Sequence, residues 1–379
     1  MKVSFITSGH LPKDDRTYYH QARTLTESGF KTEIISSKLL FSGVENGVAF
    51  NCFDDDNLTK KEKIERFVQL LNNSKPDIII CQEPLTVFAA TKFKKQAVTK
   101  PEIVYDITEW FPSKKFLARY GFVLKTVNFI KILIFNLITA SKADAYIFGE
   151  WYKSRPYRIL FPRKKFIYSG YYPDLKYITL KEPALGDNHL QLSYSGKLSI
   201  EKGFGNFLNA IFKLTEKRPG LKISIKVIGW YDNKKEQADF ENTIDSLPEN
   251  VKFTFYPMQE FFTFIKLISD TDIFLDLRSD DLENRHCLPI KLFYYAALKR
   301  PVIYTTLKAI RKEVEISKFG YLVNPEDANN ISDLILNYID NKSLYLQHCS
   351  AARKLAETRY NWSTIKDDFI EFIYNLNKK

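Results

Sequence analysis

The stretch Tyr194-Ser-Gly-Lys-Leu-Ser-Ile-Glu-Lys-Gly-Phe-Gly205 decides how the second half of this chain folds. It begins at the last residue of the alternating apolar run Leu190 to Tyr194, and this run predicts a β-strand. The residues that follow recur at helical spacing and predict a crossover helix: Phe204, Phe207, Leu208, Ile211 and Phe212. A strand, a glycine-containing turn and a helix in succession bring free backbone N–H groups and a helix N-terminus together, which is an arrangement that binds anions.

Two lysines of this turn are candidate ligands for the anion. Gly196 and Gly203 let the backbone approach a ligand closely, while Lys197 and Lys202 add positive charge from two sides of the turn. A diphosphate would suit such a pocket. The alternative is that both lysines are solvated and that the glycines only shape the connection, and the local sequence leaves both interpretations open.

Short β-rich apolar runs alternate with helix-like segments along the whole chain, as in parallel sheets built from βαβ units. We predict these strands: 2–7, 32–36, 77–81, 102–106 and 145–148 in the first half, and 191–195, 222–228, 251–255, 272–277 and 302–305 in the second. The segment Thr17 to Ser28, stopped by Gly29, is the predicted first crossover helix. The expected fold class is therefore α/β, with two Rossmann-like sheets in tandem.

The length of 379 residues favours two domains, because a single core usually stops growing at roughly 250 to 300 residues. A hydrophobic content of 45%, with 30 Phe and 22 Tyr, is enough for two cores. We expect a first domain over 1–172, a polar linker over 173–188, a second domain over 189–360, and a terminal helix over 361–379 that packs back on the first domain.

The cysteines predict neither a zinc site nor a redox site. They are far apart and form no Cys-x-x-Cys pair: Cys52, Cys81, Cys287 and Cys349. The N-terminal apolar run Val3 to Ile6 is too short for the core of a signal peptide. We therefore expect reduced thiols in a cytoplasmic protein.

The formal net charge of +11 favours an anionic partner, although a compositional bias toward Lys, Asn, Ile, Phe and Tyr explains part of it. The distribution is informative, because region 110–173 contains 12 basic residues and only two acidic ones, Asp144 and Glu150. We expect an anionic membrane surface as a partner of this region. Nucleic acid is not expected, because no recognised nucleic-acid-binding motif accompanies the charge.

The most apolar region is 116–141, and its longest charge-free run, 132–141, is half of the roughly 20 residues that cross a bilayer. We therefore do not expect it to span. Three basic residues six positions apart would point in three directions around one helix, which argues against an in-plane amphipathic helix: Arg119, Lys125 and Lys131. We predict two shorter core helices broken near Gly121, and membrane-facing helices are the alternative.

The segment GKLSIEKGF at 196–204 resembles part of glycosyltransferase family 4, retaining enzymes of GT-B architecture that use nucleotide-activated sugars. In that family two basic residues of a Gly-Arg/Lys-Leu, then Glu-Lys-Gly, segment bind the donor diphosphate, and Lys197 and Lys202 are at those positions. Other segments are similar in the family's order over almost the whole chain: HLPKDDRTYYHQARTLTESGFKTEII at 10–35, IVYDITEWFP at 103–112, LPIKLFYYAALKRPVI at 288–303 and RYNWSTI at 359–365.

The resemblance implies which residues form the site. Those expected to bind the donor are Gly9, Gly196, Lys197, Lys202, Gly229, Tyr256, Glu283, Asn284, Pro289, Ile290, Lys291 and Tyr294. Those expected in catalysis are Thr108, Glu109, Lys197 and Lys202. The lysines would stabilise the departing diphosphate electrostatically, so neither a metal nor a cofactor is expected besides the nucleotide sugar as substrate.

The sequence departs from the family at several of these positions. Thr108 stands where the family has its active-site His, with Asp106 and Glu109 nearby, and Tyr294 replaces the Glu that grips the ribose. A phenol cannot reproduce charged hydrogen bonds of about 1.5 to 3 kcal/mol each, so Glu283 is the candidate replacement carboxylate. His10, His286 and Arg16 are further candidates near predicted loops. Bulky residues replace family glycines and favour an unusual donor or no turnover: Trp230, Tyr256 and Lys299.

The expected function is retaining, metal-independent hexosyl transfer from a nucleoside-diphosphate donor to a glycan or lipid-linked acceptor. The expected setting is surface polysaccharide or cell-envelope glycan synthesis, in the cytoplasm and peripheral to the inner membrane face. Two alternatives remain: a catalytically silent GT-B-like subunit that binds a nucleotide sugar or a partner, and a nucleotide-sugar epimerase on the same architecture.

Overall fold

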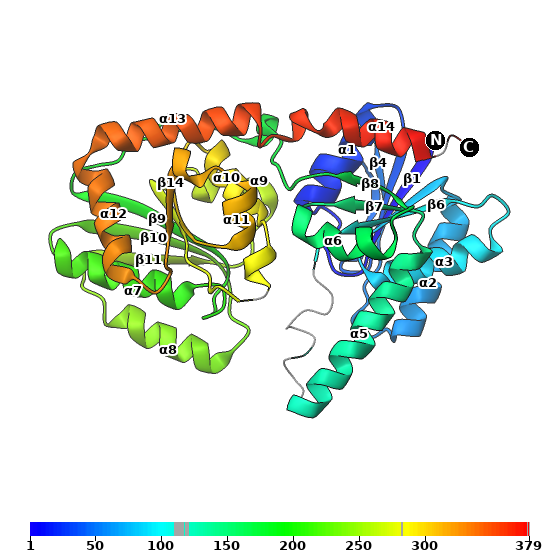
Figure 1. Ribbon diagram of the computed structural model, residues 1–379, viewed down its shortest axis with the longest axis horizontal. Helices are drawn as coiled ribbons and strands as arrows, with labels where there is room; N and C mark the ends of the chain where they lie inside the picture. The colour runs from blue at the N-terminus through cyan, green and yellow to red at the C-terminus, as the bar shows by residue number, and fades with distance from the viewer. Residues whose placement is uncertain (110–116, 118–120, 282, 377, 379) are drawn as a thin grey trace. The chain divides into compact units, whose positions relative to one another are not determined.

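The chain forms two compact units, each with its own sheet (Figure 1). The computed structural model describes residues 1–109, 117, 121–281, 283–376 and 378. Unit 1 comprises Met1–Tyr171 and Trp362–Lys379, and unit 2 comprises Tyr172–Asn361. The segment 173–188, expected to be a linker, falls within unit 2. The predicted α/β class with two Rossmann-like sheets is confirmed.

The sheet of unit 1 has the strand order β3-β4-β2-β1-β5-β6-β7-β8. The strands are β1 (Lys2–Thr7), β2 (Lys31–Ser36), β3 (Ser42–Glu45), β4 (Val48–Asn51), β5 (Ile78–Cys81), β6 (Glu102–Ile107), β7 (Ala145–Phe148) and β8 (Lys165–Tyr168). All neighbours pair in parallel except the β3–β4 hairpin. The sequence patterns do not predict β3, β4 and β8, which are four-residue strands at or near the sheet edges.

Among the described residues, the helices of unit 1 are η1 (Asp15–Ala22), α1 (Arg23–Glu27), α2 (Lys60–Ser74), α3 (Pro84–Gln96), α5 (Phe122–Lys142), α6 (Trp151–Leu160), η5 (Trp362–Thr364) and α14 (Lys366–Leu376). The predicted first crossover helix is thus present, but its first part is a π-helix. The Asp14 side chain caps it by accepting a hydrogen bond from the Thr17 N–H at 3.0 Å. Apolar residues of β1, β5 and β6 form the core with α2 and α3.

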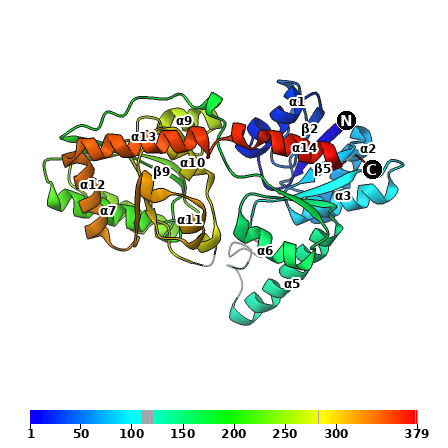
Figure 2. The ribbon, with the colours of Figure 1, turned by 45° about the horizontal axis from the view of Figure 1, so that its top comes forward.

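The C-terminal helix α14 belongs to unit 1, as the sequence predicts (Figure 2). Trp362, which precedes it, is 1% exposed. Its indole Nε1 donates to Thr24 Oγ1 at 2.8 Å, and its ring stacks on His20. This buried contact attaches the last segment of the chain to the first crossover helix.

The sheet of unit 2 is parallel with the order β11-β10-β9-β12-β13-β14. Its strands are β9 (His189–Lys197), β10 (Lys222–Trp230), β11 (Val251–Tyr256), β12 (Ile273–Asp276), β13 (Val302–Thr305) and β14 (Gly320–Val323). Its α-helices are α7 (Phe204–Lys217), α8 (Lys234–Asp245), α9 (Phe261–Ile268), α10 (Ile290–Ala297), α11 (Lys308–Glu313), α12 (Ala328–Asp340) and α13 (Lys342–Thr358). The apolar residues predicted for α7 are largely buried against β9 and β10, and Phe212 is 40% exposed.

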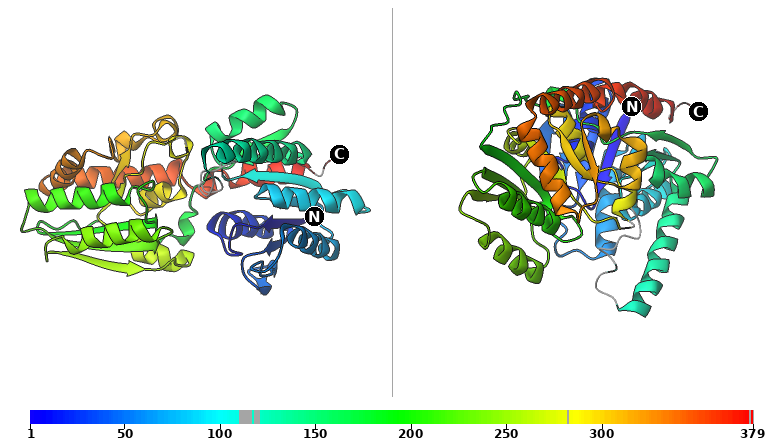
Figure 3. Two further views of the ribbon diagram at one scale, coloured as in Figure 1. Left: turned by 90° about the horizontal axis from the view of Figure 1, so that it is seen from below. Right: turned by 60° about the vertical axis from the view of Figure 1, so that its left-hand side comes forward.

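Helix α5 differs from the prediction. Its N-terminal end extends away from the sheet of unit 1 in Figure 1 and in the right-hand view of Figure 3. One face is apolar and exposed, at Val123, Val127, Ile130, Ile134 and Ile138. The buried side of the helix carries instead Asn136, Thr139 and Ala140. The prediction of a core helix is therefore wrong for 122–142, and most of the segment before it lies outside the described residues.

By length and composition alone, the stretch Val123–Lys142 meets the requirements of a membrane span, and 17% of its most apolar part is buried. Core helices of other proteins pass the same test. Lys125 and Lys131 interrupt the stretch, so its hydrophobicity alone assigns it no role.

Candidate functional site

Each sheet has a topological switch point, where successive strands leave its first strand in opposite directions. This point lies between β1 and β5 in unit 1 and between β9 and β12 in unit 2. Ligands of open parallel sheets bind outside the carboxyl ends of the strands at such points. The candidate site residues therefore belong to the segments that follow these four strands.

The glycines of the turn after β9 allow close backbone packing. Gly196 has a φ of 114° and Gly203 a φ of 82°, which are backbone conformations that residues other than glycine rarely adopt. A Cβ on Gly203 would lie 2.2 Å from the Leu277 carbonyl oxygen, and one on Gly229 would lie 1.9 Å from the Gly196 carbonyl oxygen. The turn is therefore held against the segment that follows β12.

Three predicted residues meet beside this turn. Lys202 Nζ donates to Asn284 Oδ1 at 3.0 Å and is 3.4 Å from a carboxylate oxygen of Glu201. Asn284 is 1% exposed, and its Nδ2 donates to the Glu201 carbonyl oxygen at 3.1 Å. Lys291 Nζ donates to the carbonyl oxygen of Ser195, at the end of β9. We refer to Lys202, Asn284 and Lys291 as the basic cluster.

The ammonium groups of Lys202 and Lys291 repel each other electrostatically. Removal from water lowers the pKa of Lys291 to about 8; the charges of Arg278 and Lys202 act in the same direction, and that of Asp276 opposes them. Asp276 and Arg278 form a buried bidentate pair at 2.7 and 2.6 Å. This pair was not predicted from the sequence, although the Asp-Leu-Arg sequence at the end of a predicted strand is a usable signal.

Lys197 is placed differently from Lys202. Its Nζ pairs with Asp232 Oδ2 at 2.9 Å, and its side chain is 33% exposed. The structure thus brings Lys202 together with Lys291, whereas Lys197 interacts with the loop after β10. The sequence predicts the same role for Lys197 and Lys202, but the two side chains have different surroundings in the structure.

The other predicted donor residues are found around the same strand ends. Tyr294 is 1% exposed and packs against Phe261 and Phe264, so in this structure its ring has almost no surface for a ligand. Pro289 and Ile290 begin α10, which has no side-chain cap, and neither does α7. Tyr256 ends β11 and is half-buried, and the Glu283 N–H donates to Asp281. Their roles in donor binding stay predictions.

The structure places two of the residues that stand where the family has glycine, and it places His286. Lys299 has a φ of 61°, so this lysine adopts the left-handed conformation that a glycine would adopt more easily. Trp230 ends β10 and is 45% exposed. His286 lies half-buried in a 3-10 turn (Asn284–His286) that contains Asn284.

In unit 1, Glu83 is the central carboxylate, and sequence reasoning missed it. It follows β5, is 15% exposed and accepts hydrogen bonds from the Thr7 hydroxyl at 2.7 Å and from the N–H groups of Ser8 and Gly9 at 2.9 and 3.0 Å. A Cβ on Gly9 would lie 2.8 Å from Glu83 Oε1, so glycine makes room for the carboxylate. Burial raises the pKa of Glu83.

His10 lies between two carboxylates. Its Nδ1 is 3.4 Å from Asp14 Oδ2, and its Nε2 is 4.0 Å from Glu83 Oε1. Burial alone would lower the pKa of His10, but the hydrogen bond and charge of Asp14 and the charges of Glu83 and Glu109 raise it to about 10. Although burial opposes it, the interaction with His10 lowers the pKa of Asp14 to about 2. His10 is therefore an imidazolium at neutral pH.

The backbone at Thr108 is held from two sides. Its carbonyl oxygen accepts hydrogen bonds from the Tyr171 hydroxyl at 3.0 Å and from Lys153 Nζ. Lys153 in turn pairs with Glu150 at 2.5 Å. The Thr108 hydroxyl is buried and has no hydrogen-bond partner among the described residues, and Glu109 next to it is exposed.

These groups line a pocket of about 840 Å³, within the size range of ligand pockets. Its polar side includes His10, Glu83, Thr108 and Glu109, with Lys38, Lys60 and Lys131. Its apolar side is formed by Ile64, Leu85, Phe88, Ile132 and Phe135, of which the last two come from α5. We refer to it as the unit 1 pocket.

Arg16 and Asp106 of unit 1 form a buried bidentate pair. Arg16 Nε and Nη2 donate to the two Asp106 carboxylate oxygens at 3.0 and 2.9 Å. Gln21 also donates to Asp106, and Arg16 Nη1 donates to the Ser169 carbonyl oxygen. The pair connects the first crossover helix with β6 and with the segment after β8. Both residues are less than 5% exposed and have a structural role here.

The fold, two sheets with the candidate residues at their strand ends, is that of the GT-B glycosyltransferases. Residues 189–341, which carry the basic cluster, match the family model for glycosyl transferases group 1. This confirms the resemblance inferred from the sequence. A comparison with curated proteins by sequence gave no match.

Several solved structures have the same fold. Sucrose-phosphate synthase from Thermosynechococcus elongatus has a TM-score of 0.76 at 13% identity, with 99% of each chain covered. HepE from Anabaena in complex with UDP has a TM-score of 0.72 at 15% identity, covering 99% of this chain and 100% of that one. The lipopolysaccharide outer core galactosyltransferase WaaB has 0.63 at 15%, with 99% of each chain covered. At such identities the similarity concerns the fold.

Proposed function

We propose that this protein is a retaining glycosyltransferase that uses a nucleoside-diphosphate sugar as donor. The observation that carries the proposal is the basic cluster at the carboxyl end of β9, inside the region that matches the glycosyl transferases group 1 family. The HepE structures in complex with UDP and with UDP-glucose support this class of donor.

The donor diphosphate would bind at the basic cluster. Lys202 and Lys291 would supply positive charge, and Asn284 orients the Lys202 ammonium group. The N-termini of α7 and α10, which have no side-chain cap, lie at the same strand ends and would favour a bound anion. As the bond to the sugar breaks, these groups would stabilise the growing charge on the leaving diphosphate without a metal ion.

The acceptor would occupy the unit 1 pocket. Its apolar side and its three lysines suit an amphiphilic, negatively charged molecule, so we favour a lipid-linked glycan acceptor. Thr108 stands where the family has its His, and in front-face transfer the leaving diphosphate can take the acceptor proton. The exposed Glu109 carboxylate and the His10 imidazolium would orient the acceptor hydroxyl.

A panel of nucleotide sugars tests the function. We expect at least one to raise the melting temperature, because a ligand that binds the folded state stabilises it by mass action. Release of nucleoside diphosphate with transfer to a lipid-linked acceptor would then establish the reaction. Binding without hydrolysis or transfer would favour the silent subunit, which the burial of Tyr294 motivates. Conversion of the donor without an acceptor would favour an epimerase.

Donor binding is expected to take up a proton at about pH 9. The pKa of Lys291 is lowered to about 8, so this residue is mostly neutral at pH 9 in the free protein, and a bound diphosphate favours its charged form. Titration calorimetry in two buffers of different ionisation enthalpy measures the uptake, with the best-stabilising nucleotide sugar as ligand. Lys291→Arg stays charged and should show no uptake. Equal uptake in both proteins would contradict the role of Lys291.

The protein is expected to lose stability above neutral pH through His10. The pKa of His10 is raised from 6.5 to about 10, so its contribution is complete below pH 6.5 and is lost as the pH rises through 10. Urea unfolding at pH 7 and at pH 9.5 should show a smaller decrease in unfolding free energy for His10→Gln than for the unchanged protein. The same decrease in both proteins would show that His10 is not the group that titrates.

We also propose that the protein works at the inner membrane face, in cell-envelope or surface polysaccharide synthesis. The exposed apolar face of α5 supports the membrane contact, and Lys125, Lys131 and Lys142 of the same helix would attract anionic lipid. The variant Ile130→Ser/Ile134→Ser should bind vesicles containing phosphatidylglycerol less than the unchanged protein. Equal flotation of both proteins would remove α5 from the membrane contact.

A further inference from the structure

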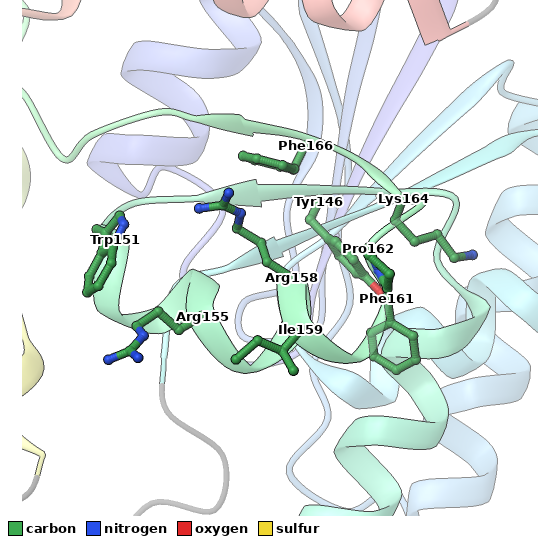
Figure 4. Close-up of a pocket in the computed structure, with 9 residues that line it drawn as sticks. All are labelled: Tyr146, Trp151, Arg155, Arg158, Ile159, Phe161, Pro162, Lys164 and Phe166. Atoms are coloured by element: carbon green, nitrogen blue, oxygen red, sulfur yellow. The ribbon is translucent and has the colours of Figure 1, made fainter.

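A second pocket of unit 1 is built from different residues than the candidate sites described above (Figure 4). It has a volume of about 370 Å³ and lies between α6 and β8. Three basic residues line it, and no acidic residue does: Arg155, Arg158 and Lys164. The other lining side chains are aromatic or apolar, including Trp151, Ile159, Phe161 and Phe166. We refer to it as the α6 pocket.

Aromatic rings hold both arginines of the α6 pocket in place. The Arg155 guanidinium lies over the Trp151 ring at 5.0 Å, and the Arg158 guanidinium lies over the Phe166 ring at 4.8 Å. Arg158 Nη1 also donates to the Tyr168 hydroxyl at 3.2 Å. Because stacking already restricts these side chains, less conformational entropy is lost when an anion binds them.

Neither arginine forms an ion pair with a carboxylate within the part of the chain that the structure describes. Other arginines of the chain do, namely Arg218 with Asp340, Arg285 with Asp280 and Arg353 with Glu357. The sequence explains the difference, because 151–173 contains basic residues but no acidic one. The charges of Arg155 and Arg158 are therefore without a counterion from this segment, whereas Lys164 Nζ donates to the Ala143 carbonyl oxygen and points away from both in Figure 4.

Apolar surface adjoins these charges. Ile159 and Leu160, at the end of α6, are 72% and 52% exposed. Helix α6 is tied to α5 by a buried hydrogen bond from Asn136 Nδ2 to the Tyr157 hydroxyl at 2.8 Å. The α6 pocket is thus attached to the helix whose apolar face is exposed. Basic side chains next to exposed apolar side chains suit a lipid phosphate at the boundary between water and hydrocarbon. A dissolved anion would gain nothing from the apolar side chains.

We infer that the α6 pocket binds the headgroup phosphate of an anionic phospholipid. The planar guanidinium groups of Arg155 and Arg158 donate to the phosphate oxygens, and Ile159 and Leu160 contact the lipid. The inference rests on the proposed membrane contact of α5 and adds a specific lipid site to it. It is independent of the donor chemistry in unit 2.

The test compares flotation with vesicles of phosphatidylcholine that contain or lack 30% phosphatidylglycerol. Arg155→Ala/Arg158→Ala should bind the anionic vesicles about 30-fold less tightly than the unchanged protein, since each basic group near an anionic surface contributes about 1 kcal/mol. Lys234→Ala/Lys235→Ala removes the same charge from exposed positions of α8 in unit 2 and should bind nearly as well as the unchanged protein. Arg155→Lys/Arg158→Lys keeps the charge and should still bind about fivefold less tightly, because the planar donors are lost.

Several outcomes would overturn the inference. Three results would show that the α6 pocket is not a specific headgroup site. These are unchanged binding of the double alanine variant, an equal loss in the Lys234/Lys235 control, and full binding of the double lysine variant. Calorimetry with soluble glycerol 1-phosphate distinguishes a dissolved ligand, and tight binding of it without a preference for anionic vesicles would contradict the lipid assignment. The thermal shift with nucleotide sugars, read on every variant, separates failure of this site from failure of the proposed transferase function.

Discussion

Lys202→Ala is expected to weaken nucleotide-sugar binding by about 1.5 to 3 kcal/mol and to lower the transfer rate by about 10² to 10³. Asn284 holds the Lys202 ammonium group, which lies at the switch point between β9 and β12. Its charge would act more strongly on the leaving diphosphate than on the bound donor, so the rate should fall more than the affinity. Calorimetry and initial rates measure the two effects.

Lys197→Ala is the matched control for this prediction. Lys197 belongs to the same turn, but it pairs with Asp232 and is one-third exposed, so its removal should reduce donor affinity much less. Equal losses in the two variants would show that general positive charge, rather than the basic cluster, binds the donor. Unchanged affinity in a folded Lys202→Ala protein would refute the diphosphate site.

Arg16→Met is expected to destabilise unit 1 by about 3 to 5 kcal/mol, because it leaves the Asp106 carboxylate buried without its charged partner. The pair is bidentate and almost inaccessible to water, and Arg16 also holds the Ser169 carbonyl oxygen. Chemical unfolding followed by tryptophan fluorescence measures the loss. Trp151 and Trp362 both belong to unit 1 and report on it.

The pair Arg218–Asp340 is the control, since it has the same bidentate geometry, at 2.8 and 2.8 Å, but lies at the surface. Arg218→Met should cost less than about 1 kcal/mol. In the double variant Arg16→Met/Asp106→Leu most of the stability should return, because no unpaired charge stays buried. A loss in Arg16→Met no larger than that in Arg218→Met would contradict the structural role of the pair.

Much of the fold was predictable from local patterns. Strands such as β5, β7 and β13 were located because each is a short, mostly apolar run that is buried on both faces. The strands β3 and β8 were missed because each is only four residues long and its residues are half-buried or exposed, so these segments resemble loops. The strands β4 and β14 were also missed; they are equally short, and each is only partly buried. Edge strands form because a neighbouring strand is present, and a local pattern does not contain that information.

The candidate site was predictable only in part. Lys202 and Lys291 were found through their motifs, and the structure brings them together although 88 residues separate them. Glu83 was missed because its partners are Thr7, Ser8 and Gly9, more than 70 residues away in the chain. An isolated Gln-Glu-Pro after a strand carries no sign that the β1 turn will surround its carboxylate.

The sequence by itself determined that this chain forms parallel sheets with glycine turns at their strand ends, because periodicity and turn chemistry are local properties. Only the tertiary structure decided which charges meet and which faces stay exposed. Helix α5 shows the reason: the spacing of Val123, Val127, Ile130, Ile134 and Ile138 specifies one apolar face, but the protein packs against the opposite side, at Asn136, Thr139 and Ala140. A helical pattern specifies a face and cannot specify on which side of the helix the rest of the protein will lie.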